Sequence, residues 1–251
     1  MSPNPILKAL SSIRMSGARA LLMGGQACIC YGAAEFSRDL DLLVLVDTDN
    51  LARLKTALED LRSELVAAPA FEPEYLKRGH GVHFRCRRED LAGLRIDLMA
   101  VLRGVAPFQE LWDRRTTIQV AGEPVELLAL EDLVRAKKTQ RDKDWPMIRR
   151  LMEQSYFGSE APAPVEFWLR ELRSPELLIA VSAAYPDLAN RIAEARPAVR
   201  AALRGDSEEV VRLLQEEEGR ERRLDRDYWE PLRRELEQLR RARKSDEQTR
   251  R

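Results

Sequence analysis

The segment from Ala20 to Val46 constrains the fold of this chain more than any other. It begins with a short apolar run, meets Gly24 and Gly25, continues through small residues and ends in a second apolar run that contains Asp39 and Asp41. This order is typical of a strand, a tight glycine turn, a helix packed closely on a sheet, and a second strand. The second strand is predicted to be central, and it carries carboxylates where an ordinary buried strand carries none.

Composition indicates a globular chain without a membrane span. The 251 residues suffice for one large or two small domains, and 42 basic residues balance 42 acidic ones, so net charge indicates no nucleic-acid or membrane partner. The sequence lacks an apolar run of membrane-spanning length, and its N-terminal residues do not have the pattern of a signal peptide, so we expect neither feature. Its three cysteines, Cys28, Cys30 and Cys86, are typical of small buried residues in a reduced compartment. We therefore expect a cytoplasmic protein.

The remaining pattern predicts an α/β (α+β) fold, with a mixed sheet followed by an all-helical C-terminal region. Hydrophobic periodicity changes from mixed to purely helical after Leu130, and residues 158–164 (GSEAPAP) are the best candidate linker. We expect two domains, residues 1–157 and residues 165–251. The predicted elements of the first domain are helices at 5–16, 26–34 and 49–65, strands at 20–23, 39–46, 80–88 and 91–102, and a hairpin over 116–128.

Asp39 and Asp41 are predicted to bind a cation. They are two residues apart on a strand, so both side chains leave the same face, and burying two unpaired carboxylates would be costly. Oxygen ligands of this kind suit a magnesium ion that also binds substrate phosphates. Asp97, at an exposed-parity position of a later strand, supplies a third carboxylate. Together the three could form a metal site for in-line phosphoryl or nucleotidyl transfer.

Gly24 and Gly25 are predicted to lie beside the phosphates of such a substrate. Glycine lets the backbone approach a ligand closely, and a helix start presents N–H groups with positive polarity. We therefore expect a nucleoside triphosphate to rest at this turn.

Taken together, these residues resemble the nucleotidyltransferase superfamily related to DNA polymerase beta, and most closely its minimal and AbiEii-like bacterial members. The resemblance covers about residues 18–153 and rests on LLMGG, DLD, RIDLM and the lysine-containing KKTQRDKDW that begins at Lys137. It implies a nucleotidyltransferase core in which a nucleoside monophosphate moves from its triphosphate to an acceptor hydroxyl of RNA, a protein or a small molecule. Some family members are toxins, which adds an antitoxin to the partners to be considered.

The resemblance also implies a role for each matching residue. Asp39, Asp41 and Asp97 would be catalytic and would ligate Mg²⁺, with Asp97 also activating the acceptor hydroxyl. The residues that would hold the nucleotide are Gly24, Gly25, Ser37, Arg38, Lys137, Lys138, Arg141 and Asp144.

Two departures from the family pattern favour an alternative. Gly25 stands where many relatives have serine, and Glu35 stands where they have an arginine. The alternative is a catalytically inactive nucleotide-binding or partner-binding module of the same fold. His80 and His83 are interpreted as polar surface residues, or as lining a nucleotide pocket.

Overall fold

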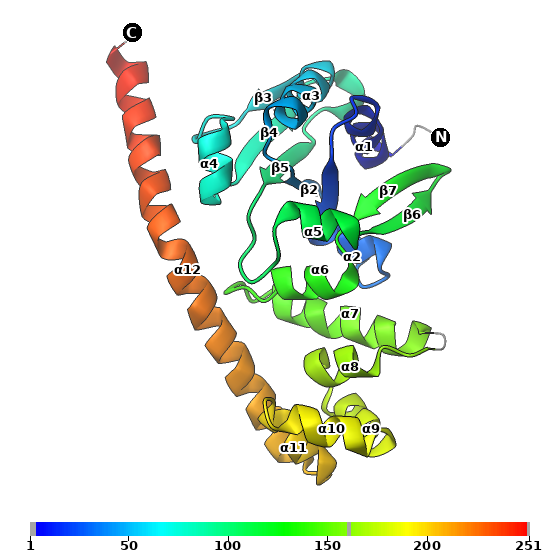
Figure 1. The fold of residues 1–251 in the computed structure, drawn as a ribbon. Coiled ribbons are helices and arrows are strands. Elements are labelled where there is room, and N and C mark those ends of the chain that lie inside the picture. The colour runs from blue at the N-terminus through cyan, green and yellow to red at the C-terminus, as the bar shows by residue number, and fades with distance from the viewer. Residues whose placement is uncertain (1–3, 160–161, 250–251) are drawn as a thin grey trace. The chain divides into compact units, whose positions relative to one another are not determined.

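A computed structural model describes residues 4–159 and 162–249 of the chain (Figure 1). The chain divides into two compact units. Unit 1 comprises Met1–Cys30, Glu35–Leu133 and Tyr228–Arg251, and unit 2 comprises Tyr31–Ala34 and Val134–Asp227. In this division the helices directly after Leu133 group with the later helices rather than with the sheet. The domain bounds expected from the sequence, 1–157 and 165–251, stay a prediction.

All seven strands of the described chain belong to unit 1 and form one mixed sheet in the order β3-β4-β5-β2-β1-β7-β6. β1 pairs with β2 antiparallel and with β7 parallel, whereas β2 pairs with β5 parallel. The strands are β1 (Ala20–Met23), β2 (Asp39–Val44), β3 (Ser63–Leu65), β4 (Val82–Cys86), β5 (Arg95–Met99), β6 (Thr116–Val120) and β7 (Glu123–Leu127).

The sequence before Leu130 contributes short helices between the strands, and the sequence after it contributes only helices in the described residues, as predicted. The helices are α1 (Pro5–Met15), α2 (Gly24–Cys30), α3 (Thr48–Asp60), α4 (Pro73–Arg78), the 3-10 helix η1 (Glu89–Leu91), α5 (Phe108–Asp113), α6 (Leu130–Ala136), α7 (Asp144–Gly158), α8 (Val165–Glu171), α9 (Pro175–Ala184), α10 (Pro186–Ala193), α11 (Pro197–Leu203) and α12 (Ser207–Thr249). The predicted α/β class, with a mixed sheet and a helical C-terminal region, is confirmed.

The core of unit 1 forms around the centre of the sheet. The β1 side chains from Leu21 to Met23 and the β2 side chains of Leu40 and Leu42–Val44 are buried. Burial of these apolar side chains fixes the register of both strands, because a shift by one residue would turn them to the other face. The same register determines the face of the sheet on which the side chains of Asp39 and Asp41 lie.

The helix predicted over residues 49–65 is shorter in the structure. α3 ends at Asp60, Arg62 adopts a left-handed backbone with φ of 48°, and residues 63–65 become the edge strand β3. Ser63 and Leu65 pair with Cys86 and Phe84 of β4. The leucine spacing extends past the helix, but hydrogen bonding to the sheet decides the conformation of its last residues.

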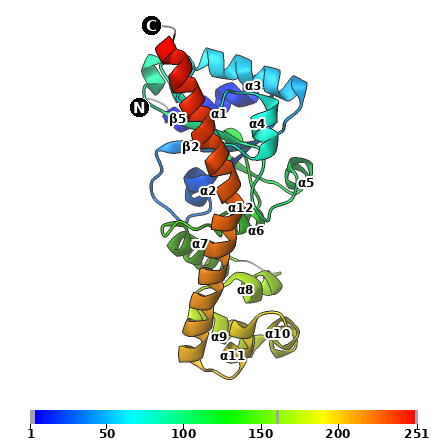
Figure 2. The ribbon, with the colours of Figure 1, turned by 90° about the vertical axis from the view of Figure 1, so that its left-hand side faces the viewer.

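Unit 2 is helical in the residues described. Trp145, Ile148 and Leu151 of α7 and Trp168 of α8 are buried in its core, and α9, α10 and α11 pack together just before α12 begins (Figure 2). None of the described helices is both long and apolar enough to cross a membrane.

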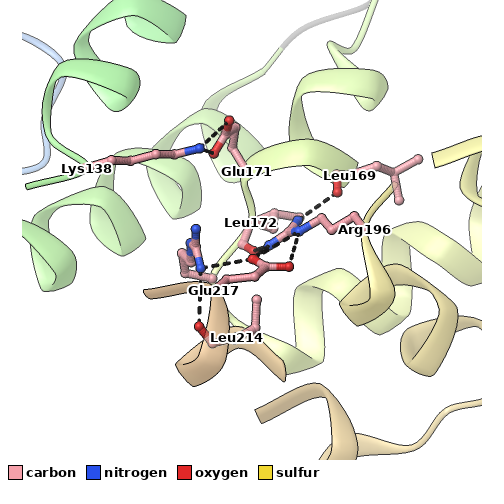
Figure 3. Close-up of polar contacts among 8 residues, drawn as sticks. Lys138, Leu169, Glu171, Leu172, Arg196, Leu214 and Glu217 are labelled. Carbon is pink, nitrogen blue, oxygen red and sulfur yellow. Dashed lines mark hydrogen bonds and ion pairs between the residues drawn. The ribbon is translucent and has the colours of Figure 1, made fainter. Parts of the chain in front are cut away.

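Buried polar contacts link α8 and α12 within unit 2 (Figure 3). The Arg196 guanidinium donates to the carbonyl oxygens of Leu169 and Leu172 at 2.7 and 2.8 Å, and its Nε lies 3.1 Å from Glu217. Arg173 reaches the same carboxylate at 3.1 Å. Arg196 therefore satisfies carbonyls at the end of α8, and Glu217 of α12 balances two buried arginines.

Candidate active site

Asp41 and Asp97 are direct neighbours across two parallel strands. The β2–β5 register pairs Asp41 with Asp97 and Asp39 with Arg95. Side chains that are paired in register share one face of a sheet, and adjacent strands lie about 4.8 Å apart. The three predicted metal ligands are thus brought to one face of the sheet, with Asp39 and Asp41 both half-buried.

The glycine pair packs closely against Asp41 of β2 and against Ser37 in the loop before this strand. Gly24 has φ of +67°, and a β-carbon built on it would lie 2.6 Å from Cγ of Asp41. A β-carbon on Gly25 would lie 2.8 Å from Cβ of Ser37. Gln26 Nε2 donates to the Ser37 carbonyl at 2.8 Å, which holds the loop before β2 against α2. Both glycines are therefore needed for this close approach, and the turn lies directly beside Asp41.

Arg38 is exposed and directly precedes Asp39 of β2. Its guanidinium lies 5.7 Å from the ring centre of Phe36, which is itself exposed. Such a cation–aromatic contact keeps a positive charge close to the predicted phosphate turn.

Asp97 is buried, which corrects the exposed position that strand alternation predicted. Its residue exposure is 9%, because His83 and Arg95 lie against the carboxylate. His83 Nδ1 lies 2.8 Å and Arg95 Nε 2.7 Å from the same Oδ1 atom of Asp97. The β4–β5 register places His83 directly opposite Asp97.

The two contacts keep Asp97 ionised. Burial alone would raise the pKa of the carboxyl, but hydrogen bonds from His83 and Arg95 and their positive charge lower the pKa of Asp97 below its ordinary value. An ionised carboxylate only accepts hydrogen bonds, so His83 donates from Nδ1. Arg95 Nη2 lies 3.1 Å from that nitrogen, and this approach is a contact between two donors rather than a second hydrogen bond.

All three aspartates raise the pKa of Arg95. The hydrogen bond to Asp97 raises the pKa of Arg95, and the charges of Asp97, Asp39 and Asp41 raise it further, against a smaller opposing effect of burial. The positive charge predicted to accompany the aspartates is, in this structure, a guanidinium.

The donor set has the chemistry for Mg²⁺, since three carboxylates from neighbouring strand positions are hard oxygen ligands. Within the described part of the chain, however, no three histidine, cysteine, aspartate or glutamate side chains meet closely enough to hold a metal ion. At Asp97, Oδ1 already accepts hydrogen bonds from Arg95 and His83. The donor set therefore suits the ion, and a metal ligated by Oδ1 of Asp97 would have to replace one of these two donors.

The predicted phosphate-binding residues after Leu133 belong to unit 2 and are paired there. Asp144 accepts from Lys137 Nζ at 3.1 Å, Arg141 Nε at 2.7 Å and Thr139 Oγ1 at 2.6 Å. Burial alone would raise the pKa of Asp144, but the charge of Lys137 and the other contacts lower it. Lys138 Nζ lies 2.7 Å from Glu171 (Figure 3). A phosphate-binding role for this set stays a prediction.

His83 and Arg95 are the residues at this site whose role sequence reasoning missed. Arg95 precedes Asp97 by two positions, and His83 has exposed parity on β4, so strand alternation already assigned each to an outward face. What the sequence did not contain was the pairing of β4 with β5, which places His83 opposite Asp97.

Comparison with known proteins gives distant structural likenesses. No family model matches the chain, and no curated protein sequence matches it. An antigenic nucleotidyltransferase-like protein from Paracoccidioides brasiliensis is 19% identical with a TM-score of 0.41, over 81% of this chain and 94% of that one. ANT(2")-Ia, solved with adenylyl-2"-tobramycin, is 17% identical with a TM-score of 0.36, over 80% and 95%. JHP933 from Helicobacter pylori is 12% identical with a TM-score of 0.36, over 91% and 94%. Likenesses this distant do not assign an activity to the chain.

Proposed function

We propose that this chain is a magnesium-dependent nucleotidyltransferase. The observation that carries the proposal is the alignment of Asp41 with Asp97 across β2 and β5, with Asp39 on the same face and the Gly24 turn against Asp41. Several carboxylates on one sheet face next to a close backbone turn are what a metal-bound polyphosphate requires. An ordinary structural role would need neither the second aspartate nor the glycine contact.

In the proposed reaction, an acceptor hydroxyl attacks the α-phosphorus of a nucleoside triphosphate. A new oxygen–phosphorus bond forms while the bond to the bridging oxygen breaks, and pyrophosphate leaves. Mg²⁺, when bound, would supply positive charge for the developing phosphate charge. Asp39, Asp41 and Asp97 would hold it, and Asp97 would also orient the acceptor hydroxyl and take up its proton.

The remaining predicted residues would bind the nucleotide. Backbone groups at Gly24 and Gly25 would approach the phosphates, with Ser37 and Arg38 beside them. Lys137, Lys138, Arg141 and Asp144 keep the nucleotide-binding role that the family resemblance implies. The acceptor would be a hydroxyl of RNA, of a protein or of a small molecule, and a toxin-like role would bring an antitoxin as a partner.

The test measures transfer of label from α-labelled triphosphates to tRNA, protein and aminoglycoside acceptors in the presence of Mg²⁺. We expect Asp39→Asn and Asp41→Asn to reduce transfer by about a thousandfold or more, since each removes a charged oxygen ligand. Asp60→Asn is the matched control, because Asp60 is exposed at the end of α3. Undiminished transfer in both β2 variants would refute the assignment.

The Arg95–Asp97 pair favours one alternative, the catalytically inactive binding module. If that alternative is right, calorimetry will show triphosphate binding that does not depend on Mg²⁺, and no acceptor will be labelled. Magnesium-dependent triphosphate binding that is lost in Asp41→Asn would argue for the enzyme.

A further inference from the structure

Arg95 binds one of the three carboxylates that are predicted to hold a metal ion. Its Nε binds Asp97 Oδ1 at 2.7 Å, and its strand position is directly opposite Asp39. Three carboxylates on one face repel one another, and a guanidinium among them reduces that repulsion. Arg95 therefore gives this face a charge balance in the absence of any ion.

Arg95 is also the member of the pair that can move. Its side chain is 40% exposed, whereas the side chain of Asp97 is 13% exposed and fixed between His83 and the sheet. An arginine side chain has several rotatable bonds and can leave a surface ion pair without disturbing the core. Displacing it would therefore leave β5 and Asp97 in place.

Arg95 and a metal ion compete for one oxygen of Asp97, Oδ1. Oδ1 already accepts hydrogen bonds from Arg95 Nε and His83 Nδ1, which uses both of its lone pairs. A metal ligated by this oxygen must remove at least one donor, and Arg95 is the exposed one.

We infer that Arg95 competes with Mg²⁺ for the aspartates and is transferred to the triphosphate when the metal–nucleotide complex binds. The inference rests on the proposed function and adds a positioning residue to it. A guanidinium released from a carboxylate can bind a phosphate in the same forked geometry. Metal binding would then depend strongly on the nucleotide.

The experiment measures Mg²⁺ binding to the full chain by calorimetry, first without nucleotide and then with a non-hydrolysable triphosphate. We expect Arg95→Gln to bind Mg²⁺ alone about tenfold more tightly than the natural chain, because no cation has to be displaced. We expect the same variant to lose most of the gain in metal affinity that the triphosphate produces. Arg87→Gln is the control, since Arg87 pairs with Glu64 at 2.8 Å and is well exposed.

Unchanged or weaker binding of Mg²⁺ alone by Arg95→Gln would overturn the inference. A second measurement needs no loss-of-charge variant: the Arg95 Nε–H signal of the natural chain, assigned with Arg95→Lys, should shift on addition of Mg²⁺ and triphosphate. A signal that stays in place at saturation would equally overturn it.

The two proposals fail in different ways. If Mg²⁺ binding does not depend on Asp39 or Asp41, the proposed function itself is wrong. If Mg²⁺ binding and transfer require both aspartates but Arg95→Gln behaves like Arg87→Gln, only the role of Arg95 is wrong.

Discussion

Gly24 is the residue that joins the glycine turn to the aspartates. Its left-handed backbone and its approach to Asp41 leave no room for a side chain. Gly24→Ala should destabilise the chain by roughly 3 kcal/mol or more, because a strained backbone and a steric clash act together. It should also weaken triphosphate binding, because Asp41 has to move.

Gly104→Ala is the matched control for this change. Gly104 has φ of +70°, but among the described residues no atom lies within 4 Å of the position that a β-carbon would take. Only the backbone penalty of about 1–2 kcal/mol therefore applies. Urea unfolding of both variants measures the difference. Equal destabilisation by the two changes would contradict the close contact between Gly24 and Asp41.

For single residues, the sequence predicted which side chains could bind a metal ion or a phosphate, but not which of these side chains contact one another. Asp39 and Asp41 could be paired by strand alternation alone, because both lie on one strand. The neighbours of Asp97 could not be identified, because they depend on the register of β4, β5 and β2, which no local pattern encodes. Burial of Asp97 follows from those neighbours.

Between elements, Glu217 holds α8 and α12 together through Arg196 and Arg173. Glu217→Gln should reduce the free energy of unfolding by about 3–5 kcal/mol, because two buried guanidinium groups lose their counter-charge. Glu216→Gln, one position earlier on the same helix, should leave it almost unchanged, since Glu216 is mostly exposed. Thermal and urea unfolding of the two variants give the comparison; similar losses would argue against the buried cluster.

Most helices and strands could be predicted because the spacing of their apolar residues matches the face that is buried in the structure. β1, β6 and the start of α1 coincide with the predicted strands and helix. The clearest exception is the segment after Asp60, where a helical leucine repeat continues into residues that pair with β4. A repeat of this kind cannot reveal that the end of a helix is followed by an edge strand.

For the molecule as a whole, the last helix completes unit 1. Trp229 and Leu232 lie within 3.5 Å of the β-carbon position of Gly79, and Glu235 Oε2 lies 2.9 Å from His80 Nε2. A chain that ends at Asp227 should expose the buried His80 and lower the urea midpoint of unit 1. Hydrogen exchange of residues 75–86 should become faster. A chain that ends at residue 242 keeps these contacts and serves as the control, and equal exchange in both chains would contradict the prediction.

The discontinuous composition of unit 1 has a consequence for protein synthesis. Its strands lie within residues 20–127, but the segment that covers Gly79 and His80 begins at Tyr228 and is translated only after the helices that precede it. Most of unit 2, Val134–Asp227, is translated between these two parts, so it can form before unit 1 is complete. A nascent chain stalled before Tyr228 would carry the aspartates and the glycine turn on a sheet that still lacks this segment.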